Sequence, residues 1–129
     1  MIDWLDVEYY EIFHEESVES LNVLEDLIDN IVDDICSEDL DRLFRIFHSL
    51  KGIAGMMGLQ DLSDANHLIE NNLKSVDVNS KEQVDEFKKW LTLSRDSLQD
   101  MVMTLNDYVL KESPSAPNLR PYFEQIRKY

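Results

Sequence analysis

The chain has 129 residues, the size of one ordinary domain, and its 43% hydrophobic and 30% charged residues are typical of a packed globular protein. Its formal net charge of −15, from 27 acidic and 12 basic residues, disfavours binding to nucleic acids and to anionic lipid surfaces. The chain has no apolar run of about 18 residues and carries acids among its first residues, so it predicts neither membrane insertion nor a secretory signal. We therefore expect one cytoplasmic domain over residues 1–129.

The first expected helix spans roughly residues 4–35, where apolar side chains recur on one stripe and acids surround it. The lone cysteine, Cys36, follows this helix. A single cysteine cannot form an internal disulfide or a thiolate metal cluster, and we expect it to be a small packed side chain. The stripe of the first helix consists of Phe13, Leu21, Leu24, Ile28, Ile31 and Ile35.

Two more helices are expected in the next segment of the chain. Ser37 precedes two acids, a pattern typical of a helix start, because the hydroxyl can cap free amides and acids favour the positive first turn. A second helix is therefore predicted over residues 38–57. Gly58 is well placed to end it, since glycine takes the left-handed conformation at little cost. A third helix is predicted over residues 60–76.

The last two expected helices begin at recognisable caps. Ser80 and Gln83 form a capping-box signature for a fourth helix over residues 81–111, whose apolar positions alternate spacings of three and four. Asn118 can cap a short last helix over residues 118–128. Because short connections between long amphipathic helices produce antiparallel neighbours, the sequence predicts an all-α, antiparallel up-down four-helix bundle with a short fifth C-terminal helix.

All three glycines of the chain lie between His48 and Gly58, although a glycine inside a helix costs about 1 kcal/mol relative to alanine. At roughly 100° per residue, Gly52 lies about 40° from His48 around the helix, Gly55 about 20° on the other side, and Lys51 about 60° away. This face would leave the imidazole open to a second protein, with a positive charge beside it, which suits phosphoryl transfer. The glycines could instead serve only close helix crossing, and spacing alone leaves both interpretations open.

A histidine nucleophile needs its other ring nitrogen held by a carboxylate or carbonyl, which fixes the tautomer. Glu70 lies one turn from His67 on the predicted third helix, so the two side chains could reach an adjacent helix. From spacing alone, the interpretation that both are solvated surface residues is the favoured one.

The stretch from His48 to Gly58 resembles the phosphorylation-site signature of histidine-containing phosphotransfer (HPt) domains. In its variant with Ser49, Ala54 and Gly55, it is most similar to the N-terminal phosphotransfer domain of CheA-type chemotaxis sensor histidine kinases. The resemblance extends to an acidic first helix and the order of five helices. It also includes the approach to the histidine given by Phe44 and Arg45, and the His-Leu-x-Glu sequence given by His67, Leu68 and Glu70.

This resemblance implies that His48 accepts a phosphoryl group from a kinase ATP-binding domain and donates it to a response-regulator receiver aspartate. It also implies a role for each neighbour: Glu70 would bond the inner nitrogen of the imidazole, Lys51 would stabilise the phosphoryl oxygens, and His67 would complete the polar network. Gly52 and Gly55 would keep access open.

Ile53 departs from the family pattern, in which a small residue is common at this position. It lies about 140° from His48 on the helix and is therefore expected to face the core. The chain carries no glycine-rich nucleotide-binding region, so we expect no cofactor and no self-phosphorylation. Met1 suits the natural start of a chemotaxis kinase, and the end at Tyr129 suits an excised fragment. A free-standing phosphorelay protein is the alternative.

Two rival functions belong to other classes. Glu11 and His14 have the Glu-x-x-His spacing of carboxylate-histidine metal bundles, but Asp64 and His67 offer only a weaker second copy, so no metal is expected. A purely interacting bundle could bind a receiver without carrying phosphate. Such a protein would not need His48.

Overall fold

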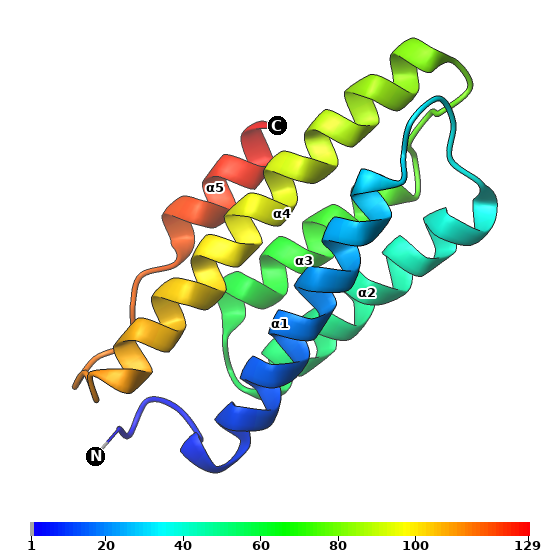
Figure 1. Cartoon of the computed structure of the whole chain (residues 1–129). Coiled ribbons are helices and arrows are strands. Elements are labelled where there is room, and N and C mark those ends of the chain that lie inside the picture. Colours follow the sequence, from blue (N-terminus) through cyan, green and yellow to red (C-terminus); the bar gives the residue numbers. More distant parts are fainter. Residues whose placement is uncertain (1) are drawn as a thin grey trace.

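The computed structural model describes residues 2–129, and these form five α-helices with no strand among them. The prediction of an all-α fold is therefore confirmed. Figure 1 shows the four long helices lying alongside one another, with the short last helix against α3 and α4. The helices are α1 (Val7–Asp29), α2 (Ser37–Met56), α3 (Gln60–Leu73), α4 (Lys81–Leu110) and α5 (Arg120–Lys128).

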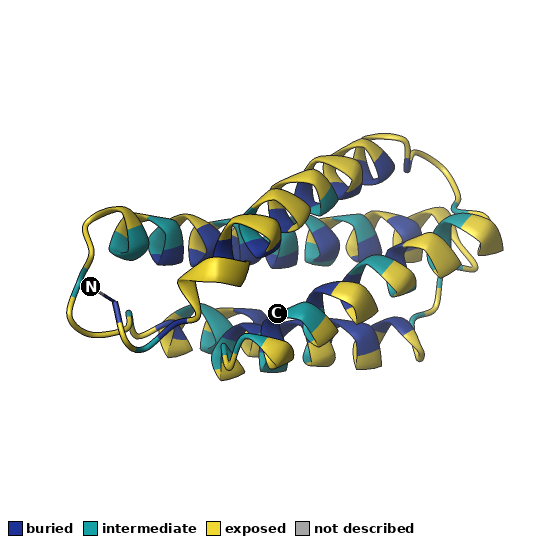
Figure 2. Ribbon diagram, turned by 90° about the horizontal axis from the view of Figure 1, so that it is seen from below, coloured by how far each residue is buried: buried dark blue, intermediate teal, exposed yellow. Residues whose placement is uncertain are grey.

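The buried side chains of all five helices face a shared interior, while the outward faces are mostly exposed (Figure 2). Burying one large apolar side chain stabilises a fold by roughly 1.5–3 kcal/mol, so this interior accounts for much of what holds the helices together. No helix within residues 2–129 is both long and apolar enough to cross a membrane. The largest fully buried apolar side chains are Phe13, Phe47, Leu24, Leu43, Ile69, Leu91, Leu98, Met101, Leu105 and Ile126.

Helix α1 is shorter than the predicted span of 4–35, because it begins at Val7 and ends at Asp29. The amide of Ile31 bonds the carbonyl of Ile28 at 3.0 Å, which tightens the last turn. Acids gather at this end of the helix, where the negative pole of the helix dipole opposes them. Ile31 stays buried and Ile35 half-buried although both lie in the connection to α2. The apolar spacing therefore continues beyond the helix itself.

Two expectations about the start of α2 are wrong. Cys36, not Ser37, occupies the N-cap position, and neither side chain supplies a capping hydrogen bond there. The thiol of Cys36 is also exposed rather than packed. The exposure of Cys36 follows from the early end of α1, because the chain reaches this position through a surface connection and not on an apolar helical stripe.

The start of α4 has the predicted cap. Ser80 Oγ accepts a hydrogen bond from the amide of Gln83 at 3.1 Å. Gln83 Oε1 accepts in return from the amide of Asn79 at 2.8 Å, one residue earlier than in the standard box. Asn118 Oδ1 likewise accepts from the amide of Arg120 at 3.1 Å, although α5 itself begins only at Arg120. Local capping chemistry therefore starts α4 and contributes to the start of α5.

The turn from α2 into α3 is a Schellman motif at Gly58. Gly58 has a φ of 74°, a left-handed conformation that an L side chain rarely adopts. Its amide bonds the carbonyl of Gly55 at 3.1 Å, and the amide of Leu59 bonds the carbonyl of Ala54 at 2.9 Å. The chain reverses here within a few residues, so α3 packs extensively against α2.

Candidate functional site

His48 stands on the outer flank of α2. Leu43, Phe47, Leu50 and Ala54 of this helix are buried and turn the opposite face inward. The side chain of His48 is therefore 61% exposed. An imidazole in this position is accessible to solvent, and another protein can approach it.

Glu70 of α3 contacts the imidazole from the side that faces the interior of the bundle. Its side chain is only 5% exposed, and its Oε1 lies 3.3 Å from Nδ1 of His48. Lys51 Nζ donates to the same Oε1 at 3.4 Å and lies 3.0 Å from Oε2, where the contact is an ion pair without the angle of a hydrogen bond. A buried carboxylate is thus paired with a cation on one side and with the histidine on the other.

The pKa of Glu70 lies below its ordinary value of 4.5. Burial is the largest single effect and raises it, but the hydrogen bonds from Lys51 and His48, together with the attraction of both groups, more than offset the burial. Glu70 is therefore a carboxylate at neutral pH, ready to accept a hydrogen bond from Nδ1–H.

The lowered pKa of Glu70 makes the stability of the fold dependent on acid. A depressed pKa in the folded chain stabilises it at pH values above the unfolded value near 4.5, and this contribution is lost as the pH falls through the folded pKa. We expect the free energy of unfolding, measured by urea titration at a series of pH values, to decline below pH 4.5 less steeply in Glu70→Gln than in the native chain. Equal slopes in the two chains would contradict this assignment.

An aromatic ring lies beside His48, and a second cation lies over that ring. The ring of Phe44, one turn earlier on α2, stacks on the imidazole with centroids 6.1 Å apart and planes 13° apart. Lys74 Nζ lies 5.7 Å from the centroid of Phe44. Phe44 belongs to the motif that the sequence shares with HPt domains. The position of Lys74 is not predictable from the sequence, because nothing in helical spacing connects the end of α3 with this turn of α2.

The glycines of α2 differ in what surrounds them. A Cβ added to Gly52 would meet nothing within 4 Å, whereas one at Gly55 would lie 3.5 Å from Ser63 Oγ. Ser63 Oγ in turn donates to the carbonyl of Lys51 at 3.1 Å and so ties α3 to this turn. The surface beside His48 is therefore open at Gly52.

Gly52→Ala should change stability and phosphoryl transfer in opposite directions. Removing a glycine from a helix interior stabilises it by about 1 kcal/mol, and the new methyl group meets no clash. The same methyl group narrows the approach to His48, so we expect slower phosphoryl transfer from a chain that unfolds at higher urea concentration. Unchanged transfer rates would show that this opening is not needed. Gly58→Ala is the control, because its positive φ predicts a loss of stability instead.

The structure does not bring His67 into the network around His48. The His67 side chain is exposed, and its Nε2 lies 3.1 Å from Nδ2 of Asn71, one turn along α3. Glu70, three residues from His67, faces inward while His67 faces solvent. Among the hydrogen bonds of residues 2–129, none joins His67 to His48, Lys51 or Glu70, so the predicted part of His67 in the polar network has no contact behind it.

The residues considered as possible metal ligands do not lie together in a metal-binding group. Within residues 2–129, no three histidine, cysteine, aspartate or glutamate side chains lie where they could hold a metal ion together. His14 instead stacks on Tyr10, with centroids 5.8 Å apart, and Glu11 is exposed. Asp64 bonds Gln60 at 2.7 Å. The carboxylate-histidine interpretation thus has no ligand set in the described structure.

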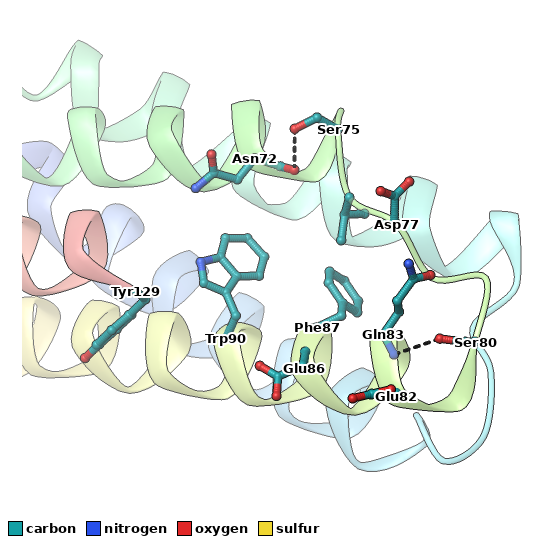
Figure 3. Close-up of a pocket in the computed structure, with 11 residues that line it drawn as sticks. Asn72, Ser75, Asp77, Ser80, Glu82, Gln83, Glu86, Phe87, Trp90 and Tyr129 are labelled. Carbon is teal, nitrogen blue, oxygen red and sulfur yellow. Dashed lines mark hydrogen bonds between the residues drawn. The ribbon is translucent and has the colours of Figure 1, made fainter.

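A cleft of about 700 Å³ opens between the end of α3 and the first half of α4 (Figure 3). Trp90 and Phe87 project into it from α4, and Asp77, Glu82 and Glu86 also line it. None of the side chains around His48 lines it. Carboxylates repel phosphate groups, so this cleft is a poor nucleotide site. The candidate site is therefore the exposed face of α2 around His48 and not this cleft.

These helices carry an exposed imidazole whose Nδ1 contacts a buried carboxylate. This arrangement is typical of a class of protein that carries a phosphoryl group on its surface and does not enclose a substrate. The model of the Hpt domain family matches residues 8–108, which is most of the chain. The chain therefore belongs to the Hpt domain family. This membership implies histidine phosphotransfer in two-component signalling, where Hpt domains interact with kinases and response regulators. The search of curated proteins finds no match.

Proposed function

We propose that His48 accepts a phosphoryl group from a kinase ATP-binding domain and donates it to a receiver aspartate. The observation that carries this proposal is the 3.3 Å contact between Nδ1 of the exposed imidazole and the buried carboxylate of Glu70. A carboxylate on Nδ1 favours the tautomer that keeps the proton there and leaves the lone pair on the outer nitrogen, Nε2.

In the first step, the Nε2 lone pair attacks the γ-phosphorus of ATP held by the kinase. The N–P bond forms, the bond from phosphorus to the ADP oxygen breaks, and ADP leaves with the electron pair. The imidazole ring then carries positive charge with its proton still on Nδ1, and the carboxylate of Glu70 stabilises that charge. In this proposal Lys51, whose Nζ lies 3.0 Å from Glu70 Oε2, also attracts the phosphoryl oxygens.

In the second step, a carboxylate oxygen of the receiver aspartate attacks the same phosphorus, and the N–P bond breaks. The electron pair returns to Nε2, so the neutral imidazole is regenerated and no proton has to be moved. His48 thus accepts the phosphoryl group in the first step and donates it in the second. This mechanism makes no use of His67.

An apolar groove at the surface of the bundle is the candidate docking surface for a receiver domain. It lies between α1 and the end of α2, has a volume of about 470 Å³, and is lined by Tyr9, Ile12, Ile53 and Met56 among others. The Met56 side chain is 89% exposed, and Ile12 is 56% exposed. Ile53 is half-buried here instead of fully in the core. Exposed apolar area of this kind marks protein contact surfaces.

We further propose the phosphotransfer domain of a CheA-type chemotaxis kinase, acting in the cytoplasm, as the particular role of residues 1–129. The resemblance of the stretch from His48 to Gly58 supports this role. An antiparallel up-down arrangement of α1 to α4 fits it and is favoured by the short connections between them. A free-standing phosphorelay protein would use the same site with a kinase in trans.

The test is a two-step transfer assay with the whole chain, the isolated ATP-binding domain of a CheA-type kinase, and γ-labelled ATP. We expect the chain to take up label that is stable to alkali and labile to acid, as phosphohistidine is. Adding a receiver domain with magnesium should then remove the label, whereas a receiver with its aspartate changed to alanine should leave it in place. Alkali-labile label, or a label that the intact receiver cannot remove, would refute the proposal.

A further inference from the structure

A small cavity lies in the core where the four long helices meet. Its volume is about 10 Å³, and six of the side chains that line it are apolar, including Leu50 of α2. The remaining two are polar: Ser17 of α1 and Asn66 of α3. Each of these two residues is only 1% exposed.

Both polar side chains end in an oxygen without a protein partner. Ser17 Oγ and Asn66 Oδ1 have no hydrogen bond to any group of residues 2–129. The other end of the Asn66 amide is occupied, because Nδ2 donates to the carbonyl of Leu62 at 2.9 Å. This bond fixes the amide and leaves Oδ1 as its free acceptor. A buried polar atom without a partner is costly, so two of them around one cavity call for an explanation.

We propose that this cavity binds one water molecule, which bridges Ser17 and Asn66. The water would donate to Asn66 Oδ1 and exchange a second hydrogen bond with the hydroxyl of Ser17. A cavity of about 10–15 Å³ holds one water, and two polar partners are the minimum that such a water needs. A purely apolar cavity of this size would stay dry.

Two residues that line this cavity are close neighbours in the sequence of Glu70 and His48, the residues of the proposed site. Asn66 precedes Glu70 by one turn of α3, and both side chains are buried. Leu50, which lines the same cavity, lies two residues after His48 on α2. The water therefore links α1 to α3, the helix that carries Glu70. The cavity that holds it is also lined by α2, the helix that carries His48.

Ser17→Ala tests the proposal, with Ser94→Ala as the matched control. Both serines are buried, and both hydroxyls lack a protein partner, but only Ser17 lines the cavity. With a bridging water, Ser17→Ala loses a hydrogen bond, and we expect its folding equilibrium constant to fall about fivefold. Ser94→Ala should leave the constant unchanged or raise it. If Ser17→Ala also leaves it unchanged or raises it, the cavity is dry and the proposal fails.

A crystal structure of the native chain gives the direct measurement. We expect electron density for one water within hydrogen-bonding distance of both Ser17 Oγ and Asn66 Oδ1. An empty cavity, or a Ser17 hydroxyl turned onto a neighbouring backbone carbonyl, would overturn the inference. Neither measurement involves phosphorylation, so its outcome is independent of the function proposed for His48.

Discussion

His48→Gln is expected to reduce phosphorylation of the chain below detection while leaving its helical content and free energy of unfolding nearly unchanged. Glutamine has no nucleophilic nitrogen, so the N–P bond cannot form. The His48 side chain is 61% exposed and fills no part of the core. Exposed substitutions of this kind usually change stability by no more than about 0.5 kcal/mol. The effect on phosphorylation is therefore chemical and not structural.

The measurement is the uptake of label from γ-labelled ATP with a kinase ATP-binding domain, followed by circular dichroism and urea unfolding of the same samples. The chain offers two matched controls, His14→Gln and His67→Gln, since it has three histidines in all. Both controls should take up label at close to the native rate. Label on His48→Gln, or its loss from either control, would move the phosphorylation site elsewhere.

Glu70→Ala is expected to slow phosphorylation of His48 by roughly 10- to 100-fold, as the loss of a hydrogen bond to a charged group implies. Without the carboxylate, nothing favours the proton on Nδ1, and the positive ring formed in the transfer loses its counter-charge. The Lys51 side chain is 25% exposed and can turn to water, so the fold should survive the loss of its partner.

Glu70→Gln separates the two effects of this side chain. Glutamine keeps an oxygen that can accept from Nδ1–H but carries no charge, so its rate should lie between those of Glu70→Ala and the native chain. Single-turnover phosphorylation at saturating kinase and ATP measures the difference, and urea unfolding checks the fold. A native rate for Glu70→Ala would remove Glu70 from the mechanism, and equal rates for the two variants would assign the whole effect to charge.

Local features of the chain were predictable because they depend on near neighbours. Apolar spacing identifies all five helices, and Ser80 with Gln83 marks the start of α4, since a cap involves residues only a few positions apart. The helix ends were less predictable. Ile31 and Ile35 continue an apolar pattern into a connection that is not helical, so the predicted first helix was too long and Cys36 was wrongly expected to be packed.

Which residues share a face with His48 follows directly from the sequence, because Gly52 and Lys51 lie within about one turn of it on the same helix and helical geometry relates them. Which partners reach that face from other helices depends on the packing of the whole chain. This packing places α3 against α2, buries Glu70 under the imidazole, brings Lys74 to Phe44, and leaves His67 in solvent. Those outcomes depend on how two helices are turned toward each other across the turn at Gly58, and no periodicity within a single helix carries that information.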